Sequence, residues 1–312
     1  MHKHKKKHPF WRGAILPRLA LMVAPFPKNT FCSIDVTSKC NLRCTHCYFY
    51  SYDQENKKEL TDEEWLAHIE TMQKGRKPFY SCTWVGGEPL LRAKLIDKGR
   101  RYFKSNRVVT NGTIPLPSWP DVEFHVSVDG TEALHDEVRG KGTYAKIKKN
   151  ILNQDQKVIL ACCLHQDNLN CINDLLEEWK KVANIRFILF DFFTPIQEVK
   201  EEMWLNFQER DLVLNKLIKL KKEKYGDFIG GPPSTFKRMM HQNKHKSVGK
   251  NCVFVKYGTA FDSCGNIKKP CVIGEKADCS RCGCIVPFSI RAWKEPSNLM
   301  REMWEAIASH TK

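Results

Sequence analysis

Between residues 31 and 190, short runs of β-branched and aromatic residues alternate with longer stretches in which apolar residues recur at helical spacing. Short apolar runs bounded by turn residues are typical of buried strands, and the longer stretches are typical of helices packed on one face. The pattern predicts six strands, at 31–36, 80–85, 107–110, 124–128, 158–164 and 185–190. It predicts helices at about 61–74, 90–104, 144–152 and 169–182.

Local signals mark the ends of several of these elements. Thr61 and Glu64 have the spacing of a capping box, in which each side chain accepts a hydrogen bond from the backbone of the other residue. The dipeptides at 111–112 and 129–130 are Asn-Gly and Asp-Gly, which are turn signals. They predict that the third and fourth strands end there.

The order of the expected elements points to one fold class. Strands that alternate with helices usually form a parallel sheet with right-handed crossovers. Six such units, rather than eight, predict an open, partial (β/α)6 barrel of the TIM-like type within the α/β class. Ligands of such sheets bind at the carboxyl ends of the strands, so we expect functional residues just after each strand.

After residue 195 the pattern changes. Residues 201–224 predict one basic amphipathic helix, 241–250 a polar linker and 297–309 a final helix. Residues 251–284 are rich in cysteine and punctuated by glycine, which predicts a small module organised by metal. We therefore expect four parts: an N-terminal extension at 1–30, the barrel at 31–200, the basic helix and linker at 201–250, and the Cys-rich module with the final helix at 251–312.

The 312-residue chain has a formal charge of +16, which is concentrated in two segments. Residues 1–34 hold seven basic residues and no acidic one, and residues 214–250 hold ten basic residues against two acidic ones. The remainder is close to neutral. The central domain is therefore electrostatically ordinary, and the excess charge belongs to its appendages.

The N-terminal segment is basic and then apolar, and it allows three interpretations. We favour a solvated tail followed by a segment that covers the bottom of the barrel. A peripheral contact with an anionic membrane surface is the second. The third interpretation is that the segment attracts an acidic peptide or nucleic acid, although nucleic acid is not expected among the partners. Pro17, Arg18 and Pro25 interrupt the apolar part and no run of 18 apolar residues occurs, so we expect no signal peptide, no transmembrane helix and a cytoplasmic location.

Fourteen cysteines are many for a chain of this length. Three lie within 40–47 and six within 252–284. Disulfide frameworks are typical of short secreted chains, whereas tight groups in a long chain indicate two metal sites in a reducing compartment. The other five cysteines are expected in the core as small hydrophobic residues: Cys32, Cys82, Cys162, Cys163 and Cys171.

The first group is Cys40, Cys44 and Cys47, which follows the first expected strand. Three thiolates on one tight loop can ligate three irons of a cubane cluster, which leaves the fourth iron open to the amino and carboxylate groups of a small molecule. The alternative is a zinc knuckle. Structural zinc sites use four protein ligands, however, and His46 is a poor fourth ligand because it lies inside the last two-residue gap.

This CxxxCxxC loop resembles that of the radical S-adenosylmethionine (radical SAM) superfamily, and the resemblance extends over about residues 31–200. The segment Gly86-Gly87-Glu88-Pro89 follows the second strand and is similar to the family's GGEP segment. Glycines let a backbone approach a ligand closely, and Glu88 can accept a hydrogen bond from an ammonium group. The alternative is a plain turn that starts a helix with proline at its first position.

Further matches follow the third and fourth strands. Thr110-Asn111-Gly112 ends the third strand, and segments 127–130 and 135–140 resemble the SxDG…HDxxRG stretch of the branch that modifies peptides and similar substrates. The resemblance implies that Ser127 contacts the ribose of SAM, Arg139 its carboxylate and His46 its adenine. The SAM-binding set that it implies is Gly86, Gly87, Glu88, Asn111, Ser127, Asp129, Arg139 and His46. Asp129 could also be a plain turn residue, and Arg139 a surface arginine.

The chemistry implied by the resemblance is reductive. An electron from a donor such as flavodoxin or ferredoxin passes through a 4Fe-4S cluster to SAM. Cleavage yields methionine and a 5′-deoxyadenosyl radical, which takes a hydrogen atom from the substrate. The protein orients the substrate and excludes water. The sequence does not identify a catalytic side chain.

The second group contains six cysteines, of which Cys279 and Cys282 have the two-residue spacing common in clusters. The pattern over Cys252, Cys271, Cys279 and Cys282 resembles the twitch module, a shortened relative of the SPASM module, and implies one auxiliary 4Fe-4S cluster. The segment around Cys264 predicts a β-hairpin that delivers Cys271. Cys264 or Cys284 could replace one of the four ligands, and a zinc ribbon is the alternative site.

We therefore expect a radical SAM enzyme, of oxidoreductase or transferase type, that acts on a peptide or a small natural product. One alternative keeps this class with a lipid or isoprenoid substrate, because hopanoid-pathway radical SAM enzymes share the GGEP and DG…HD stretches. Another is a non-catalytic iron–sulfur or zinc-binding module. The full set of SAM-binding residues argues against the last.

Overall fold

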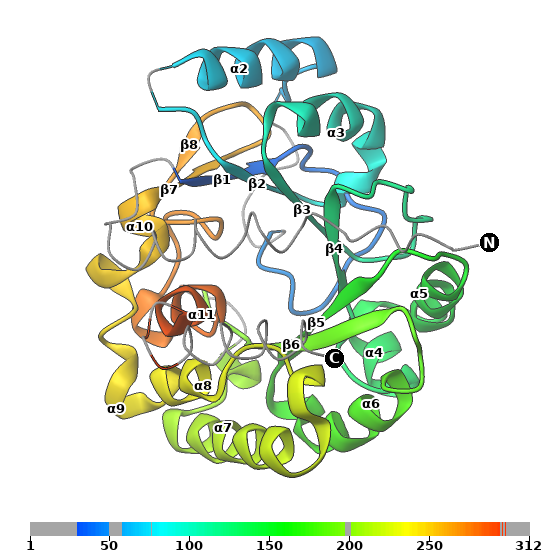
Figure 1. Ribbon diagram of the computed structural model, residues 1–312, viewed down its shortest axis with the longest axis vertical. Helices are drawn as coiled ribbons and strands as arrows, with labels where there is room; N and C mark the ends of the chain where they lie inside the picture. The colour runs from blue at the N-terminus through cyan, green and yellow to red at the C-terminus, as the bar shows by residue number, and fades with distance from the viewer. Residues whose placement is uncertain are drawn as a thin grey trace, which may run out of the picture.

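The computed structural model describes residues 30–49, 58–75, 77–196, 201–293, 295 and 297. Its centre is a curved sheet of eight strands in the order β6-β5-β4-β3-β2-β1-β7-β8 (Figure 1). Every neighbouring pair is parallel except β7 and β8. The strands are β1 (Phe31–Asp35), β2 (Ser81–Val85), β3 (Ser105–Thr110), β4 (Val122–Ser127), β5 (Val158–Leu164), β6 (Ile185–Phe192), β7 (Gly258–Phe261) and β8 (Ile267–Lys268).

The six strands expected from the sequence are all present, and the fold is the mixed α/β partial barrel that they predicted. The two strands of the Cys-rich region add a feature that the sequence did not predict. The hairpin of β7 and β8 was expected, but β7 also pairs in parallel with β1, with Phe31 opposite Gly258. The second cysteine region therefore continues the sheet of the barrel.

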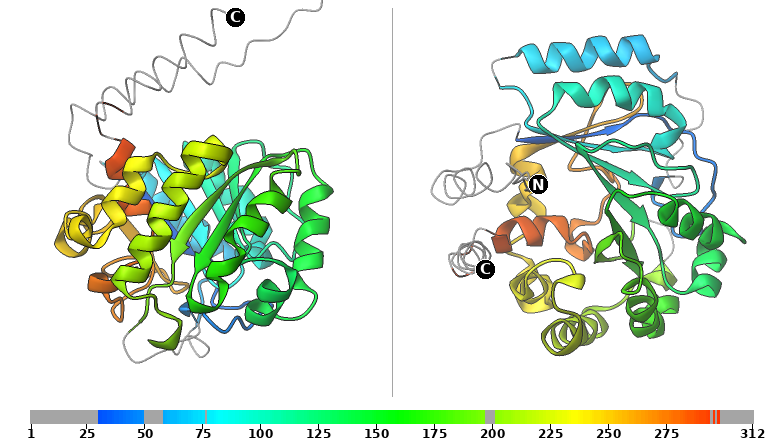
Figure 2. Two further views of the ribbon diagram at one scale, coloured as in Figure 1. Left: turned by 90° about the horizontal axis from the view of Figure 1, so that it is seen from below. Right: turned by 45° about the vertical axis from the view of Figure 1, so that its right-hand side comes forward.

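Helices line the outer side of the sheet and span its open side. The α-helices are α2 (Asp62–Lys74), α3 (Ala93–Gly99), α4 (Glu132–Arg139), α5 (Thr143–Leu152), α6 (Ile172–Trp179), α7 (Phe207–Leu220), α8 (Pro233–Met239), α9 (His241–Lys244), α10 (Val253–Tyr257) and α11 (Val286–Trp293). Helices α2 to α7 follow the outer side, and α10 and α11 lie on the open side between β7 and β6 (Figures 1 and 2).

Shorter helical turns complete the chain. The 3-10 turns are η2 (Pro89–Arg92), η3 (Arg100–Tyr102), η4 (Gln166–Cys171), η5 (Glu201–Met203), η7 (Gly226–Phe228), η8 (Gly249–Asn251) and η9 (Cys279–Arg281), and η6 (Lys221–Tyr225) is a π-helical turn.

Several helices differ from their expected form. The single helix expected over 90–104 is divided into η2, α3 and η3, and the basic helix over 201–224 begins only at Phe207. Asn206 provides a capping box there and so fixes the later start. The expected linker over 241–250 contains α9 and η8. Helix α4 was not predicted at all. Residues 1–29 and almost all of the expected helix over 297–309 lie outside the described residues.

The core lies between the sheet and its outer helices. Trp65 on α2, Trp84 on β2 and Trp179 on α6 are fully buried in it. The predicted capping box of Thr61 and Glu64 starts α2, with both reciprocal hydrogen bonds present. This packed core holds the carboxyl ends of the strands and so positions the loops that follow them.

No helix of the described residues is long and apolar enough to cross a bilayer.

Candidate functional site

The loop after β1 carries Cys40, Cys44 and Cys47 and is seated on the turn after β2. The amides of Gly87 and Glu88 donate to the carbonyls of Thr37 and Lys39, at 2.8 and 2.9 Å. A Cβ atom on Gly87 would stand 2.1 Å from the carbonyl oxygen of Lys39, so only glycine fits. The glycines were expected to make room for a ligand; in the structure, the backbone that Gly87 admits is that of the cysteine loop.

Nitrogen donors are directed at two of the three sulfurs. Asn111 Nδ2 lies 3.7 Å from the sulfur of Cys40, and Arg139 Nη1 lies 3.9 Å from that of Cys44. Burial raises the pKa of both thiols, and for Cys44 the Arg139 guanidinium opposes that rise. Metal-bound cysteine is a thiolate, and N–H donors and cations stabilise thiolates. The three thiols of the loop and the donors beside two of them therefore fit an iron–sulfur cluster.

Glu88 is fully buried at the end of β2. Its Oε1 accepts hydrogen bonds from the amide of Leu90 at 3.0 Å and from the hydroxyl of Thr110 at 2.7 Å, and its Oε2 accepts from the amide of Asn111 at 2.8 Å. The alternative of a helix start is also realised, because Glu88 caps η2 and Pro89 is its first residue. Burial raises the pKa of Glu88 and these donors oppose the rise. Glu88 thus fixes the end of β3, where Asn111 approaches Cys40.

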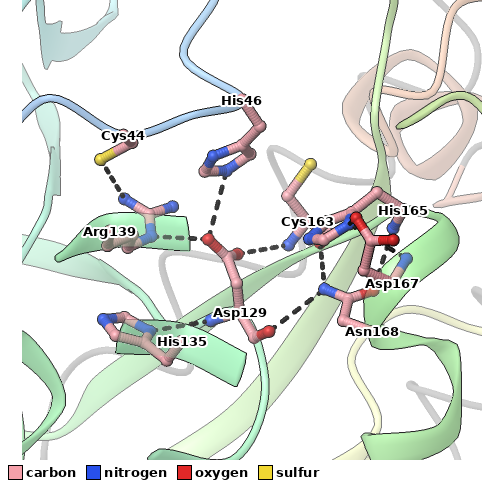
Figure 3. A network of polar contacts seen from close by, with 9 residues as sticks. All are labelled: Cys44, His46, Asp129, His135, Arg139, Cys163, His165, Asp167 and Asn168. Atoms are coloured by element: carbon pink, nitrogen blue, oxygen red, sulfur yellow. Dashed lines mark hydrogen bonds and ion pairs between the residues drawn. The ribbon is translucent and has the colours of Figure 1, made fainter. Parts of the chain in front are cut away.

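Asp129 joins three parts of the site (Figure 3). Its Oδ2 pairs with Arg139 Nε at 2.5 Å and with His46 Nε2 at 3.2 Å, and its Oδ1 accepts from the amide of Cys163 at 2.9 Å. The carboxylate is fully buried, and although burial acts to raise its pKa, the charges of Arg139 and His46 hold that pKa well below its usual range. Asp129 is therefore more than a turn residue: it ties the cysteine loop, α4 and β5 together.

The same network orients the residues assigned to SAM. Arg139 is not a surface arginine, because its side chain is 11% exposed and lies between Asp129 and Cys44. His46 is buried beside Asp129, and its Nδ1 has no hydrogen-bond partner among the described residues. Ser127 is half-buried at the end of β4. The structure brings these residues to one edge of the sheet, and their contacts with SAM stay predictions.

Part of this network was not expected from the sequence. Helix α4 presents the carbonyl of Val138 to the amide of Thr45 in the cysteine loop, at 2.9 Å. Asn168 Nδ2 donates to the carbonyls of Asp129 and Cys163, at 3.1 and 2.8 Å (Figure 3). The amide of His165 in turn donates to Asn168 at 2.9 Å. The only available signal was the position of these polar residues just after β5, where an α/β barrel places functional groups.

The second cysteine region gathers four of its thiols. Cys252, Cys271, Cys279 and Cys282 all lie within electrostatic range of one another. Burial raises the pKa of each of them, to about 12 for Cys282, and the neighbouring thiols add to the rise for Cys252, Cys271 and Cys282. These are the four cysteines whose spacing resembled a cluster module.

The two further cysteines of this region are placed differently. Cys264 lies in the turn between β7 and β8, next to Gly265, which packs against Leu60. Cys284 is half-buried and lies within electrostatic range of Asp191, Cys282 and Cys271. Within the described part of the chain, no three His, Cys, Asp or Glu side chains are placed to hold one metal ion. A four-iron cluster does not need such a group, because each thiolate ligates a different iron.

Tyr48 lies within electrostatic range of cysteines from both regions. This residue follows Cys47, and burial raises the pKa of its phenol, with Asp35, Cys47, Cys271 and Cys284 adding to the rise. An ion pair also connects the two regions, since Lys268 Nζ of β8 lies 2.6 Å from Asp35 Oδ2 of β1. The two cysteine regions therefore lie near each other at the carboxyl edge of the barrel.

The remaining cysteines are in the core, as expected, with one qualification. Cys32, Cys82, Cys162 and Cys171 are buried. Cys163 is half-buried on β5, opposite Asp191 of β6, and its amide holds Asp129.

Comparison with known proteins agrees with this geometry. Residues 34–178 match the sequence profile of the Radical SAM superfamily. The chain is 28% identical over 224 residues to a cysteine-type anaerobic sulfatase-maturating enzyme of Clostridium novyi, covering 62% of this chain and 59% of the relative. It is 30% identical over 213 residues to an Fe-coproporphyrin III synthase of Methanosarcina barkeri, covering 61% and 52%. The chain thus spans little more than half the length of these curated relatives.

A solved structure shares the fold over a larger part of the chain. The structure of Streptococcus suis SuiB bound to the precursor peptide SuiA superposes with a TM-score of 0.62 at 13% identity, covering 95% of this chain and 72% of that one. At this identity the likeness concerns the fold alone.

Proposed function

Because the chain carries a radical SAM domain over residues 34–178, we propose that it is an enzyme that cleaves SAM reductively and removes a hydrogen atom from its substrate. When bound, a 4Fe-4S cluster supplies the electron for that cleavage, which gives methionine and a 5′-deoxyadenosyl radical. Cys40, Cys44 and Cys47 would hold the cluster. The observation that carries the proposal is their loop, seated on Gly87 with nitrogen donors aimed at two sulfurs.

The protein residues around this loop would bind and orient SAM. Arg139, already ionised and fixed by Asp129, offers its remaining N–H groups to the carboxylate of SAM. His46 presents its ring and an unpartnered nitrogen to the adenine. Ser127 would contact the ribose, and Glu88 with the turn at Gly86 and Gly87 the ammonium group.

The second region would hold an auxiliary 4Fe-4S cluster through Cys252, Cys271, Cys279 and Cys282. Their mutual proximity supports this set of four, and it fills all protein positions of a cubane. A cluster closed in this way exchanges electrons and does not bind substrate through iron. An external one-electron donor such as flavodoxin or ferredoxin would supply the first cluster.

The substrate that we propose is a peptide. The Clostridium novyi relative is named for maturing a sulfatase, and the SuiB structure contains a precursor peptide. The Methanosarcina relative is named for making Fe-coproporphyrin III, at similar identity, so a tetrapyrrole is the second candidate. Incubating the reconstituted enzyme with SAM, reductant and either precursor peptides or tetrapyrroles separates the two, because only the true substrate changes mass.

The first experiment counts iron and SAM cleavage in anaerobically reconstituted protein. We expect about eight irons and eight sulfides, from two four-iron clusters, and 5′-deoxyadenosine on addition of a strong reductant. Changing Cys40, Cys44 and Cys47 together to Ala should leave about four irons and no 5′-deoxyadenosine. A triple variant that retains all its iron would show that the first site is wrongly assigned.

A further inference from the structure

Arg210 on α7 is a buried cation beside the second cysteine region. The residue is 4% exposed, and its three nitrogens donate to backbone carbonyls: Nε to Leu205 at 3.2 Å, Nη2 to Phe193 at 2.8 Å and Nη1 to Cys282 at 3.1 Å. The last bond joins the guanidinium to the backbone of Cys282, whose thiol we assign to the auxiliary cluster. The position is set by the fold, since α7 and the end of β6 both contribute to it.

No carboxylate of the described residues lies within ion-pair distance of Arg210. Its surroundings are aromatic instead, with the rings of Phe192, Trp204 and Phe207 at 5.2, 5.6 and 5.9 Å from the guanidinium carbon. Burying a cation costs several kcal/mol unless an opposite charge compensates it. Carbonyl dipoles and ring faces reduce that cost, but neither carries a full negative charge.

Three other cations of the described chain differ from Arg210 in this respect. Lys221 is the second buried cation, and its Nζ lies 3.1 Å from Asp227. Arg281, whose guanidinium also lies over the Trp204 ring, pairs with Asp278 and Glu201. Arg139 pairs with Asp129. Of these four cations, Arg210 alone has no acidic partner among the described residues.

We propose that Arg210 is the counter-charge of the auxiliary cluster and raises the cluster's reduction potential. This inference rests on the proposed function, because it requires the cluster held by Cys252, Cys271, Cys279 and Cys282. Four thiolates give such a cluster a net negative charge, and reduction adds one electron from an external reductant without breaking a bond. A fixed cation at one edge of the cluster favours the more negative, reduced state.

The test uses the full-length chain with Cys40, Cys44 and Cys47 changed to Ala, so that the auxiliary cluster alone is loaded. Arg210→Gln removes the charge, and Arg210→Lys keeps it while losing the planar donor arrangement. Lys221→Gln is the matched control, because it removes a similarly buried cation in η6, the turn that directly continues α7, about 16 Å along the chain axis from Arg210. Each variant is assayed for iron and sulfide and then titrated electrochemically with detection by electron paramagnetic resonance.

We expect Arg210→Gln to retain about four irons and to be at least about tenfold harder to reduce, which is about 59 mV for a one-electron couple. Arg210→Lys should lie much closer to the parent, and Lys221→Gln should equal it. If Arg210→Gln loses its iron while Arg210→Lys keeps it, the positive charge stabilises the bound cluster, and this outcome also supports the inference. Full iron with an unchanged potential in Arg210→Gln overturns the inference, as does equal loss of iron in both Arg210 variants. A parent protein that binds no iron would instead overturn the auxiliary cluster itself.

Discussion

The two cysteine regions lie at the same edge of one sheet, yet their surroundings differ in charge. The cation beside the first region, Arg139, is neutralised by Asp129, and the carboxylate of Glu88 lies close by. Lys268 and Arg291 also lie near cysteines of the second region, but its buried cation is Arg210, which has no carboxylate partner among the described residues. The second region also has an acid close by, because Asp191 lies near Cys284. The two regions therefore differ in whether the buried cation is paired with an acid.

The two regions also share a construction principle. Each is held against the barrel at one glycine: a Cβ on Gly87 would stand 2.1 Å from the carbonyl oxygen of Lys39, and one on Gly283 would stand 2.1 Å from that of Phe192. Contact of a cysteine loop with a strand end is therefore as tight at the second region as at the first. The difference between the regions lies in the pairing of the buried cation and in the open coordination position that we propose for the first cluster, and four experiments test it.

The largest effect is expected for Asp129→Asn, which makes the first region resemble the second by leaving Arg139 without a carboxylate. Breaking a buried ion pair by removing one partner typically costs about 3–5 kcal/mol. We expect the free energy of unfolding of the metal-free protein, measured with urea, to fall by about that amount. The control Asp167→Asn removes an acid that is 63% exposed and should change stability by less than about 0.5 kcal/mol. Equal losses of stability in the two variants would show that the ion pair of Asp129 with Arg139 does not stabilise the fold.

Glu88→Gln addresses the open position of the first cluster. The carboxylate of Glu88 accepts hydrogen bonds from three donors. The NH2 group of Gln would point at one of these donors, so that hydrogen bond would be replaced by a contact between two donors. A hydrogen bond to a charged group is worth roughly 1.5–3 kcal/mol, so SAM affinity should fall about ten- to a hundredfold while both clusters remain. Calorimetric titration with SAM measures this, with the exposed Glu70→Gln as control. Unchanged affinity would exclude Glu88 from the SAM site.

The paired variants Gly87→Ala and Gly283→Ala separate the two regions. Overpacking of this kind costs roughly 1–3 kcal/mol and displaces the adjoining loop. Gly87→Ala should lose about half the iron and all SAM cleavage, whereas Gly283→Ala should lose the other half and keep cleavage of SAM in the absence of substrate. Gly75→Ala is the control, since its Cβ would meet no atom closer than 3.4 Å. Loss of both clusters in either variant would show that the regions are not independent.

The smallest effect is expected at the opposite, amino-terminal end of the barrel, where Arg107 of β3 pairs with Glu123 of β4 at 3.0 Å. Burial acts to raise the pKa of Glu123, but the hydrogen bond with His125 and the charge of Arg107 outweigh it and lower that pKa from 4.5 to about 2. A lowered folded-state pKa means that its stabilisation is present above pH 4.5 and is lost as the pH falls toward 2. Glu123→Gln should therefore flatten the pH dependence of unfolding in that window, by about 1 kcal/mol or less because the pair is partly exposed.

Both clusters should remain unchanged in Glu123→Gln, which distinguishes this end of the barrel from the functional one. A change in iron content or in SAM affinity in this variant would mean that the two ends communicate.

The sequence predicted the local parts of this structure well. The strand Val158–Leu164 has the bounds that its apolar run indicated, and Thr61 with Glu64 starts α2 as their spacing required. Helix α4 escaped notice because its eight residues are fewer than the roughly 11 to 18 over which helical periodicity is judged. Asp129 and Arg139 were both identified, but not their ion pair. Arg210 looked like any other arginine of a basic helix, since no pattern reveals a missing partner.

Pairings between distant parts of the chain carry no local signal, and β7 is the clearest case. Its contact with β1 joins residues more than 220 positions apart in the sequence. At a synthesis rate of about 5–20 residues per second, β7 is made about ten to fifty seconds after β1. Until then the outer edge of β1 offers unpaired amides and carbonyls to any other nascent chain. A chain that ends before Gly258 would thus leave the outer edge of β1 unpaired and prone to aggregate. Strand β7 protects the finished protein by covering that edge.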